Sequence, residues 1–225
     1  FHDNLMQGQN LSFNNLKDVE AAYECLNEFK SPTCVIVKHC SPCGVASSQN
    51  ILEALKNSLS TDPISSFGGI IALNRTVDEK TAKFLIKNYY EIILAPSFTE
   101  KSLNILKDKS KLRLIKTKNI KLNLKPEIYS VNDGYISQTK NKVVINKKNI
   151  KLNSNTKAKN NEVVDLIFAL KVCKYVKSNG ITLVKNEKTI SIGGGQTSRI
   201  EAVKIALNKI GSNKSFVAAS DAFFP

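Results

Sequence analysis

The sequence contains 225 residues, of which 42% are hydrophobic, and its formal net charge at pH 7 is +14. This length suits one large or two small domains with a buried core. The apolar runs are shorter than a membrane span, and the first residues lack the basic start and apolar centre of a signal peptide. We therefore expect a cytoplasmic globular protein without a membrane partner. Because residue 1 is Phe and the last residues are apolar, we also expect a piece of a longer polypeptide.

The positive charge is concentrated in the middle of the chain. Residues 1–100 hold 8 basic and 11 acidic side chains, residues 101–160 hold 16 and 3, and residues 161–225 hold 9 and 5. A basic face supplies the phosphate-neutralising contacts of nucleic-acid-binding proteins. This segment, however, is rich in Asn and poor in aromatic residues, which is typical of a solvated surface. A nucleic-acid-binding module centred on 101–160 is therefore only the alternative function. The favoured interpretation has no nucleic-acid partner and a positive surface suited to small anionic substrates.

Helix and strand patterns alternate through the first half of the chain. Helical spacing of apolar residues predicts helices at 18–29, 51–59, 78–88 and 100–107. Runs rich in β-branched residues predict strands at 33–37, 70–73, 91–96 and 112–115. Pro63 is expected to end the second helix, and Asp78 is expected to cap the third. The alternation predicts an α/β unit with a mostly parallel sheet, which we place at residues 1–115.

The pattern weakens after this unit and then resumes. Residues 116–160 hold only strand-like pieces at 129–137 and 143–145, and we interpret them as a Lys/Asn-rich connector. A buried helix is then predicted at 163–176, with Gly180 behind it in a left-handed conformation. The remaining predicted elements are a hairpin at 181–184 and 189–192 turning at Asn186-Glu187, a helix at 199–210 and a strand at 216–220. We interpret residues 161–225 as the start of a second, truncated α/β unit related to the first.

The first candidate for chemistry is the pair Lys38-His39 at the end of the predicted strand 33–37. A Pro-Cys-Gly turn at 42–44 is expected to end the strand there. A neutral His39 can accept a proton while a cationic Lys38 stabilises negative charge. His39 is one of only two histidines in the sequence. Spacing alone fits equally well a half-exposed pair that merely closes a strand.

Glycine-rich segments form the second candidate. Residues 193–198 lead into a predicted helix, whose free amides can face an anion while Arg199 grips a phosphate or carboxylate. The segment completes neither a Walker loop nor a dinucleotide fingerprint, so a plain hairpin-to-helix turn stays open. The run 66–69 permits close backbone approach to a ligand at Gly68. Asn179 fits a helix end just as well as a site.

The five cysteines are an odd number without the spacing of a disulfide framework, which indicates a reduced protein. Cys40 and Cys43 lie beside His39 and raise the question of zinc. A zinc site commonly needs a second pair of ligands, and the sequence offers none. We therefore expect structural cysteines and no metal.

Six motifs occur in the order found in one enzyme family. They are Lys38-His39-x-x-Pro42-Cys43-Gly44, Ser66-Phe67-Gly68-Gly69, Glu91-Ile92-Ile93-x-Ala95-Pro96, Val176-Lys177-Ser178-Asn179, Gly193-x-Gly195-Gln196-x-Ser198-Arg199 and Ser220-Asp221-Ala222-Phe223-Phe224-Pro225. Over essentially the whole chain, and least between residues 116 and 160, the sequence resembles the formyltransferase half of AICAR transformylase/IMP cyclohydrolase, the bifunctional purine biosynthesis enzymes. Small departures, such as Ser41 where the family usually has Asn, leave the resemblance intact.

The resemblance implies an activity. A formyl group would pass from the co-substrate 10-formyltetrahydrofolate to the 5-amino group of AICAR, giving FAICAR and tetrahydrofolate on the way to IMP, with no metal required. The matching positions are His39 as proton acceptor, Lys38 as transition-state stabiliser, Gly68, Glu91, Asn179 and Arg199 as AICAR contacts, and Ile200 and Phe223 as folate contacts.

The resemblance also implies an architecture. The family's formyltransferase half consists of two related α/β/α units that resemble cytidine deaminase without its zinc, and it acts as a homodimer with sites near the subunit interface. The IMP cyclohydrolase domain and further AICAR and folate contacts are expected outside these 225 residues. The piece by itself is therefore not expected to be a complete enzyme.

Overall fold

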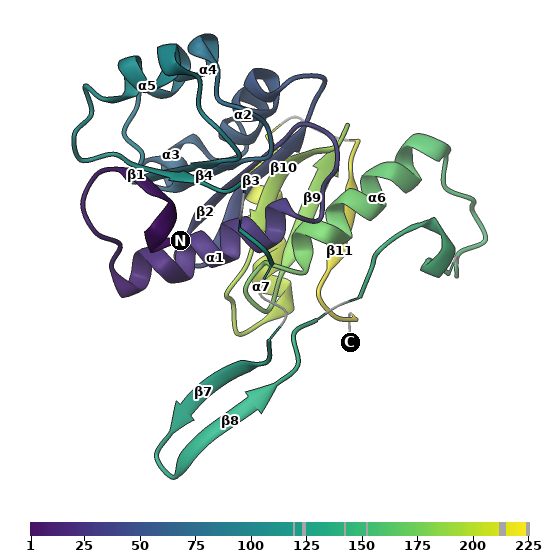
Figure 1. Ribbon diagram of the computed structural model, residues 1–225. Coiled ribbons are helices and arrows are strands. Elements are labelled where there is room, and N and C mark those ends of the chain that lie inside the picture. Colours follow the sequence, from purple (N-terminus) through teal and green to yellow (C-terminus); the bar gives the residue numbers. More distant parts are fainter. Residues whose placement is uncertain (119, 123–124, 142, 152, 212–214, 224–225) are drawn as a thin grey trace.

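The computed structural model describes residues 1–118, 120–122, 125–141, 143–151, 153–211 and 215–223. A nine-stranded mixed sheet forms the centre, and helices lie on both of its faces (Figure 1). The strands of this sheet are β1 (Leu5–Gln7), β2 (Thr33–Lys38), β3 (Ser41–Ser47), β4 (Ile70–Leu73), β5 (Ile92–Ala95), β6 (Arg113–Lys116), β9 (Ile181–Lys185), β10 (Lys188–Gly193) and β11 (Val217–Ser220). The helices are α1 (Phe13–Leu26), α2 (Ile51–Leu59), α3 (Pro63–Ser66), α4 (Glu79–Leu85), α5 (Glu100–Leu106), α6 (Asn160–Cys173) and α7 (Arg199–Asn208), with short 3-10 helices at His2–Asn4 and Lys147–Asn149.

The strands lie in the order β1-β6-β5-β4-β2-β3-β10-β9-β11. Among the strands that the structure describes, only the pairs β4–β5 and β5–β6 are parallel, so the expectation of a mostly parallel sheet is wrong. The reason is that two-residue turns join β2 to β3 and β9 to β10, and such turns can only connect antiparallel strands. The expectation of an α/β fold with helices covering the sheet is confirmed.

Strand β2 is buried on both faces, as its run of β-branched residues predicts. Val35 and Val37 pack into the core beside α1, whereas Cys34 and Ile36 pack into the core beside α2. Successive strand residues point to opposite faces, and both faces are covered, so every residue from Thr33 to Val37 is fully buried. Lys38, at the end of the strand, is therefore its first solvent-accessible residue.

Local capping sets where several helices begin. Asp78 accepts a hydrogen bond from the Thr81 amide (2.8 Å), which confirms the predicted cap of α4. Helix α1 begins at Phe13 rather than at residue 18, because Ser12 and Asn15 form a reciprocal capping box. Helix α2 ends at Leu59, before the segment Thr61-Asp62-Pro63 as predicted, and Pro63 occupies the first turn of α3.

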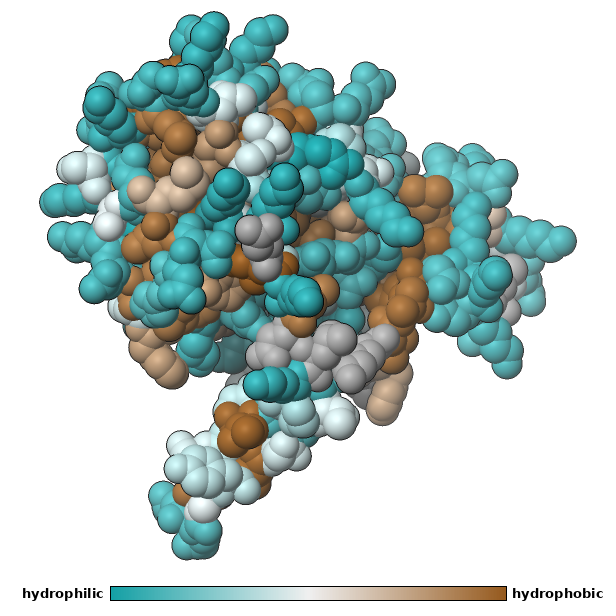
Figure 2. Space-filling view, in the orientation of Figure 1, coloured by the Kyte–Doolittle hydropathy of each residue, from teal (hydrophilic) through white to brown (hydrophobic). Residues whose placement is uncertain are grey.

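The middle and the second half of the chain correct three further expectations. Residues 127–138 form not one strand but an exposed two-stranded hairpin, β7 (Glu127–Val131) and β8 (Gly134–Gln138), which projects from the body and carries exposed apolar side chains (Figure 2). Residues 143–145 are not a strand. Gly180 is not left-handed, because the turn that follows α6 closes by hydrogen bonds from residues 174–176. The last two residues of the sixth motif, 224 and 225, lie outside the described residues.

The last six strands in the sheet order, β4-β2-β3-β10-β9-β11, are arranged symmetrically about the β3–β10 pair. The elements β4, β2 and β3 on one side match β11, β9 and β10 on the other, and these are connected in the same way along the chain. Helix α1 at 13–26 and helix α6 at 160–173 differ by 147 in number, and so do strands β4 at 70–73 and β11 at 217–220. This repeat supports our proposal of two related units, which we continue to place at 1–115 and 161–225 with a connector at 116–160.

A glycine in each repeat lets a helix pack directly on the sheet. A Cβ atom at Gly44 of β3 would lie 2.2 Å from the carbonyl oxygen of Ser58 in α2, and one at Gly193 of β10 would lie 2.1 Å from that of Ala202 in α7. Such distances are far below van der Waals contact, so neither position has room for a side chain.

We predict that Gly44→Ala destabilises the protein by roughly 1–3 kcal/mol, because α2 must move away from β3 to accommodate the methyl group. Urea unfolding followed by circular dichroism measures the change. Ser130→Ala on the exposed strand β7 is the control and is expected to alter the free energy of unfolding by less than about 0.5 kcal/mol. Equal stabilities of the two variants would contradict the packing argument.

Candidate active site at one end of the sheet

The predicted site residues all lie at the same end of the sheet. Val37, next to the end of β2, pairs with Ile70 at the start of β4, and Ile70 pairs with Ile92 at the start of β5. Lys38, Gly68 and Glu91 adjoin these positions. In the second repeat, Ile181 at the start of β9 pairs with both Gly193 at the end of β10 and Ser220 at the end of β11. Asn179, Arg199 and Phe223 adjoin these strand ends.

His39 lies in the turn of the β2–β3 hairpin. Lys38 pairs with Ser41, so His39 and Cys40 are the two turn residues, with φ values of 52° and 60°. Two positive φ angles are the signature of a type I′ turn, which normally uses Asn and Gly. The left-handed conformation costs a residue with a side chain about 1–2 kcal/mol. The predicted turn at 42–44 is therefore wrong: these residues lie within β3, and the chain reverses before them, at His39 and Cys40.

Asp18 of α1 holds this turn, and the sequence analysis missed it. Its Oδ1 atom accepts a hydrogen bond from the backbone N–H of Cys40 (2.7 Å) and a second one from the Cys40 thiol (3.3 Å). A hydrogen bond to a charged acceptor contributes about 1.5–3 kcal/mol, which is comparable to the strain of the turn. Burial and the Asp18 carboxylate both raise the pKa of Cys40, so this thiol stays protonated near neutral pH.

Lys38 connects the turn to the glycine-rich segment before β4. Its Nζ donates a hydrogen bond to the carbonyl oxygen of Phe67 (2.8 Å). The next residue, Gly68, has a φ of +70° and donates its amide hydrogen to the carbonyl oxygen of Tyr89 (2.9 Å). This hydrogen bond joins the strand end that carries Lys38 and His39 to the residue that precedes Gly68.

A pocket of about 210 Å³ lies beside the turn. It is lined by Lys38, His39, Ser41, Pro42, Cys43, Asp62, Ser65, Ile192, Gly194 and Lys209. Lys209, at the end of α7, donates to Asp62 Oδ2 (2.7 Å) at the start of α3, so an ion pair between the two repeats borders the pocket. Burial opposes ionisation of Asp62, but the hydrogen bonds from Lys209 and Ser65 outweigh it and lower the pKa of this carboxyl group. Nothing local in the sequence marked this long-range pair.

Glu91 lies two strands away from β2. Its carboxylate is 3.8 Å from the Arg113 guanidinium, which also donates to the carbonyl oxygen of Gln9 (3.0 Å). The Glu91 amide donates to the carbonyl oxygen of Gly69 (3.1 Å). Glu91 is thus held at the same sheet end as Gly68.

Asn179 ties two loops of the second repeat together. Its backbone N–H and its side-chain amide both donate to the carbonyl oxygen of Gln196 (3.1 and 2.8 Å). The amide of Gly195 returns a hydrogen bond to the carbonyl oxygen of Lys177 (2.7 Å). The loop that leads into α7 is therefore fixed against the loop that follows α6.

Arg199 begins α7 and points to the end of β11. Its guanidinium donates to the Ser220 hydroxyl (2.8 Å) and forms an ion pair with Asp221. Burial would raise the pKa of Asp221, but hydrogen bonds from Ser178 and Arg199 prevail and lower it to about 2. Arg199 has five N–H donors, so this pairing orients the side chain and leaves donors for a ligand. Ser198 occupies the N-cap position, but its side chain forms no capping hydrogen bond.

The two residues expected on the folate side, Ile200 and Phe223, are exposed. Their relative exposures are 59% and 83%. Among the described residues, no three His, Cys, Asp or Glu side chains come together in an arrangement that could hold a metal ion. No helix in the described part of the chain is long and apolar enough to cross a bilayer.

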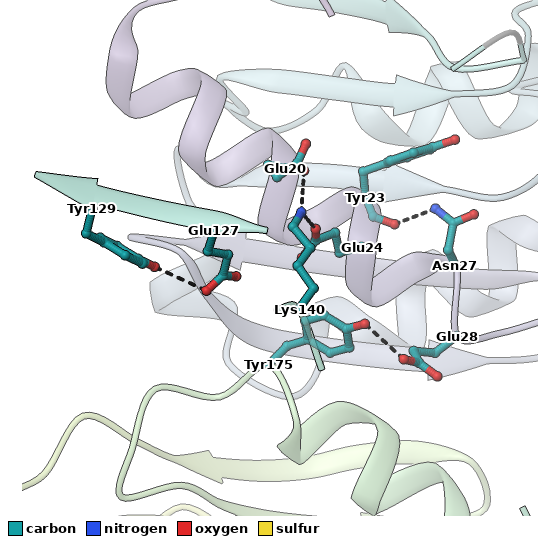
Figure 3. Close-up of polar contacts among 9 residues, drawn as sticks. All are labelled: Glu20, Tyr23, Glu24, Asn27, Glu28, Glu127, Tyr129, Lys140 and Tyr175. Carbon is teal, nitrogen blue, oxygen red and sulfur yellow. Dashed lines mark hydrogen bonds and ion pairs between the residues drawn. The ribbon is translucent and has the colours of Figure 1, made fainter. Parts of the chain in front are cut away.

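A second cavity, of about 430 Å³, contains none of the predicted site residues. Figure 3 shows its polar wall, where Lys140 reaches between Glu20 and Glu24 of α1. Burial raises the pKa of Glu24, and Lys140 offsets part of that effect. We interpret these ion pairs as contacts that fasten the connector to α1, since charge compensation at a half-buried carboxylate explains them fully.

The site residues fall into two groups along the sheet. Lys38, His39, Gly68 and Glu91 lie in or next to β2, β4 and β5, whereas Asn179, Arg199, Ile200 and Phe223 lie in or next to β9, α7 and β11. Six strand spacings of about 4.8 Å separate β5, which Glu91 precedes, from β11, which the Arg199 guanidinium reaches, so these two strands lie about 29 Å apart along the sheet.

Comparison with known proteins agrees with the motifs. A family model described as AICARFT/IMPCHase bienzyme matches residues 2–209. The bifunctional purine biosynthesis proteins PurH of Acetivibrio thermocellus and Fusobacterium nucleatum are each 46% identical over 224 residues, covering 98% of this chain and 44% of the relative. PurH of Thermoanaerobacter sp. is 45% identical over 221 residues, covering 98% of this chain and 43% of its own length. The chain thus spans less than half the length of these relatives. With the family motifs gathered at one end of the sheet and nearly the whole chain matched, the chain belongs to the AICARFT/IMPCHase bienzyme family.

Proposed function

We propose that this chain supplies the catalytic groups for transfer of a formyl group from 10-formyltetrahydrofolate to the 5-amino group of AICAR. The products would be FAICAR and tetrahydrofolate, in purine biosynthesis. The observation that carries the proposal is the type I′ turn, which places His39 exposed at the mouth of a pocket with Lys38 beside it. The complete protein would also have IMP cyclohydrolase activity. That activity would belong to a part of the PurH relatives that does not match this chain.

The proposed reaction needs a base and a cation. The nitrogen of AICAR is delocalised into its ring, so it becomes nucleophilic only as its proton is removed, and His39 would take that proton. The new N–C bond places negative charge on the formyl oxygen, which the Lys38 ammonium would stabilise. The bond from the formyl carbon to N10 of the folate then breaks, and that nitrogen receives the proton. No step requires a metal.

The other predicted residues would bind the two substrates. Arg199, held by Asp221 and Ser220, presents donors for an anionic or carbonyl group of AICAR. Gly68 allows close backbone approach, and its neighbour Phe67 carries an exposed ring. The exposed apolar side chains of Ile200 and Phe223 suit the flat aromatic parts of the folate co-substrate.

We predict that His39→Ala in the complete protein lowers kcat for formyl transfer by about 10²- to 10⁴-fold, the range expected for loss of a general base. Tetrahydrofolate formation measured by absorbance gives the rate, and circular dichroism verifies the fold. His2→Ala, which changes the only other histidine of the chain, is the control and is expected to leave kcat unchanged. Turnover of the His39 variant within threefold of the wild type would exclude His39 as the proton acceptor.

We further propose that the working form is a homodimer with sites shared between subunits. Glu91 and Arg199 are both expected to contact AICAR, yet Glu91 precedes β5 and the Arg199 guanidinium binds the end of β11, two strands about 29 Å apart along one sheet. A single ribonucleotide is far shorter than this distance. Two copies related by a two-fold axis would bring the Lys38 group of one subunit to the Arg199 group of the other.

Mixing two inactive variants tests the shared site. Refolded together, His39→Ala and Arg199→Ala subunits are expected to recover about one quarter of the wild-type rate, because half of the dimers are mixed and each mixed dimer has one intact site of two. Each variant refolded alone serves as the control and stays inactive. If the mixture recovers nothing while light scattering shows mixed dimers, each site belongs to one chain and the shared-site proposal is wrong.

A further inference from the structure

We infer that Asp18 is a positioning residue for the Lys38-His39 pair: its carboxylate fixes the backbone turn that carries His39. The inference rests on the proposed function, in which His39 accepts the proton. Asp18 touches no atom of His39 in the hydrogen-bond network and acts through the next residue, Cys40.

The first step of the argument is the backbone conformation. His39 and Cys40 both adopt positive φ angles, which residues with a Cβ atom avoid. In most type I′ turns Asn and Gly relieve this strain, and neither is present here. A contact outside the hairpin must therefore stabilise the turn. The Asp18 carboxylate supplies it by accepting the Cys40 amide hydrogen at 2.7 Å.

The second repeat contains the same arrangement. Its hairpin turns at Asn186 and Glu187, with φ values of 54° and 50°, and Asp165 of α6 accepts both of their amide hydrogens (2.8 and 2.7 Å). Asp18 precedes Cys40 by 22 residues, and Asp165 precedes Glu187 by 22 residues. A carboxylate on the helix before each hairpin thus holds a strained two-residue turn in both repeats.

The two turns differ in location. The turn at 186–187 lies at the opposite end of the sheet from His39, where the carbonyl oxygen of Glu187 accepts a hydrogen bond from the amide of Ser47. Loss of Asp165 is therefore a matched control: it removes the same kind of support from a turn that carries no site residue. Of the two aspartates, only Asp18 supports a turn that carries proposed catalytic groups.

Without Asp18, the turn is expected to relax toward negative φ angles and to displace the imidazole from Lys38 and the pocket. A misplacement of about 1 Å costs on the order of 10²-fold in rate, because the reacting atoms leave their near-attack geometry. Substrate binding depends mostly on other residues, so KM should change little.

The experiment measures formyl transfer and thermal unfolding for four variants of the complete protein. Asp18→Ala is expected to lower kcat 10- to 100-fold with KM within about threefold. Asp18→Asn keeps an oxygen acceptor and is expected to retain kcat within about threefold. Asp165→Ala is expected to lower the unfolding midpoint without lowering kcat. In Asp18→Ala/Cys40→Gly, glycine accepts the left-handed conformation at no steric cost and is expected to restore most of kcat.

The rescue variant separates positioning from chemistry and from unfolding. If the Asp18 charge acted directly on the reaction, glycine at position 40 would not restore kcat, and that result would overturn the inference. Wild-type kcat in folded Asp18→Ala, or an effect on KM alone, would overturn it as well. Should Asp18→Ala fail to fold, Asp18→Ala/Cys40→Gly is compared with Cys40→Gly alone: equal kcat values support positioning, and a kcat more than about tenfold lower in the double variant would overturn the inference. A wild-type protein without formyl transfer would instead refute the proposed function.

Discussion

Burial of strand β2 on both faces is the constraint from which the position of the candidate site follows. Each residue from Thr33 to Val37 is fully buried, with alternate side chains in two separate cores. A register shift of one residue would move each β2 side chain into the opposite core. Packing on both faces of the sheet therefore fixes the register of β2. Lys38 is consequently the first residue that solvent reaches. Two ionisable side chains thus stand on a rigid support, at the edge of a low-dielectric core.

The turn after β2 stores strain where the chemistry is proposed. Two residues with side chains hold positive φ angles, and a carboxylate from α1 offsets the cost. In the second repeat, Asp165 stabilises a turn with two positive φ angles in the same way. This indicates that the aspartate belongs to the construction of the repeated unit, and that one of its two copies also serves the site.

The continuous sheet explains why the site residues divide into two groups. Strands β3 and β10 join the two repeats and run antiparallel. Equivalent positions of the two repeats therefore lie at opposite ends of the sheet. In the second repeat, Asn179 ties its loop to the loop that leads into α7, and Arg199 ties the start of α7 to the end of β11. Asp62 and Lys209 form an ion pair across the two repeats, and the pocket beside His39, which Ile192 and Gly194 also line, lies at that junction. A second subunit would supply the missing half of each site.

The sequence by itself determined the parts of the molecule that depend on neighbouring residues. Apolar periodicity identified most helices and strands, the Asp78 cap followed from local chemistry, and six ordered motifs identified the family and its candidate residues. Only the tertiary structure decided the antiparallel strand order, the reversal at His39 and Cys40, the support from Asp18, and the distance between Glu91 and Arg199. The physical reason is that pairing partners and register depend on packing between segments far apart in the chain. The residues around Asp18 do not indicate that its carboxylate accepts a hydrogen bond from a turn 22 residues later in the chain.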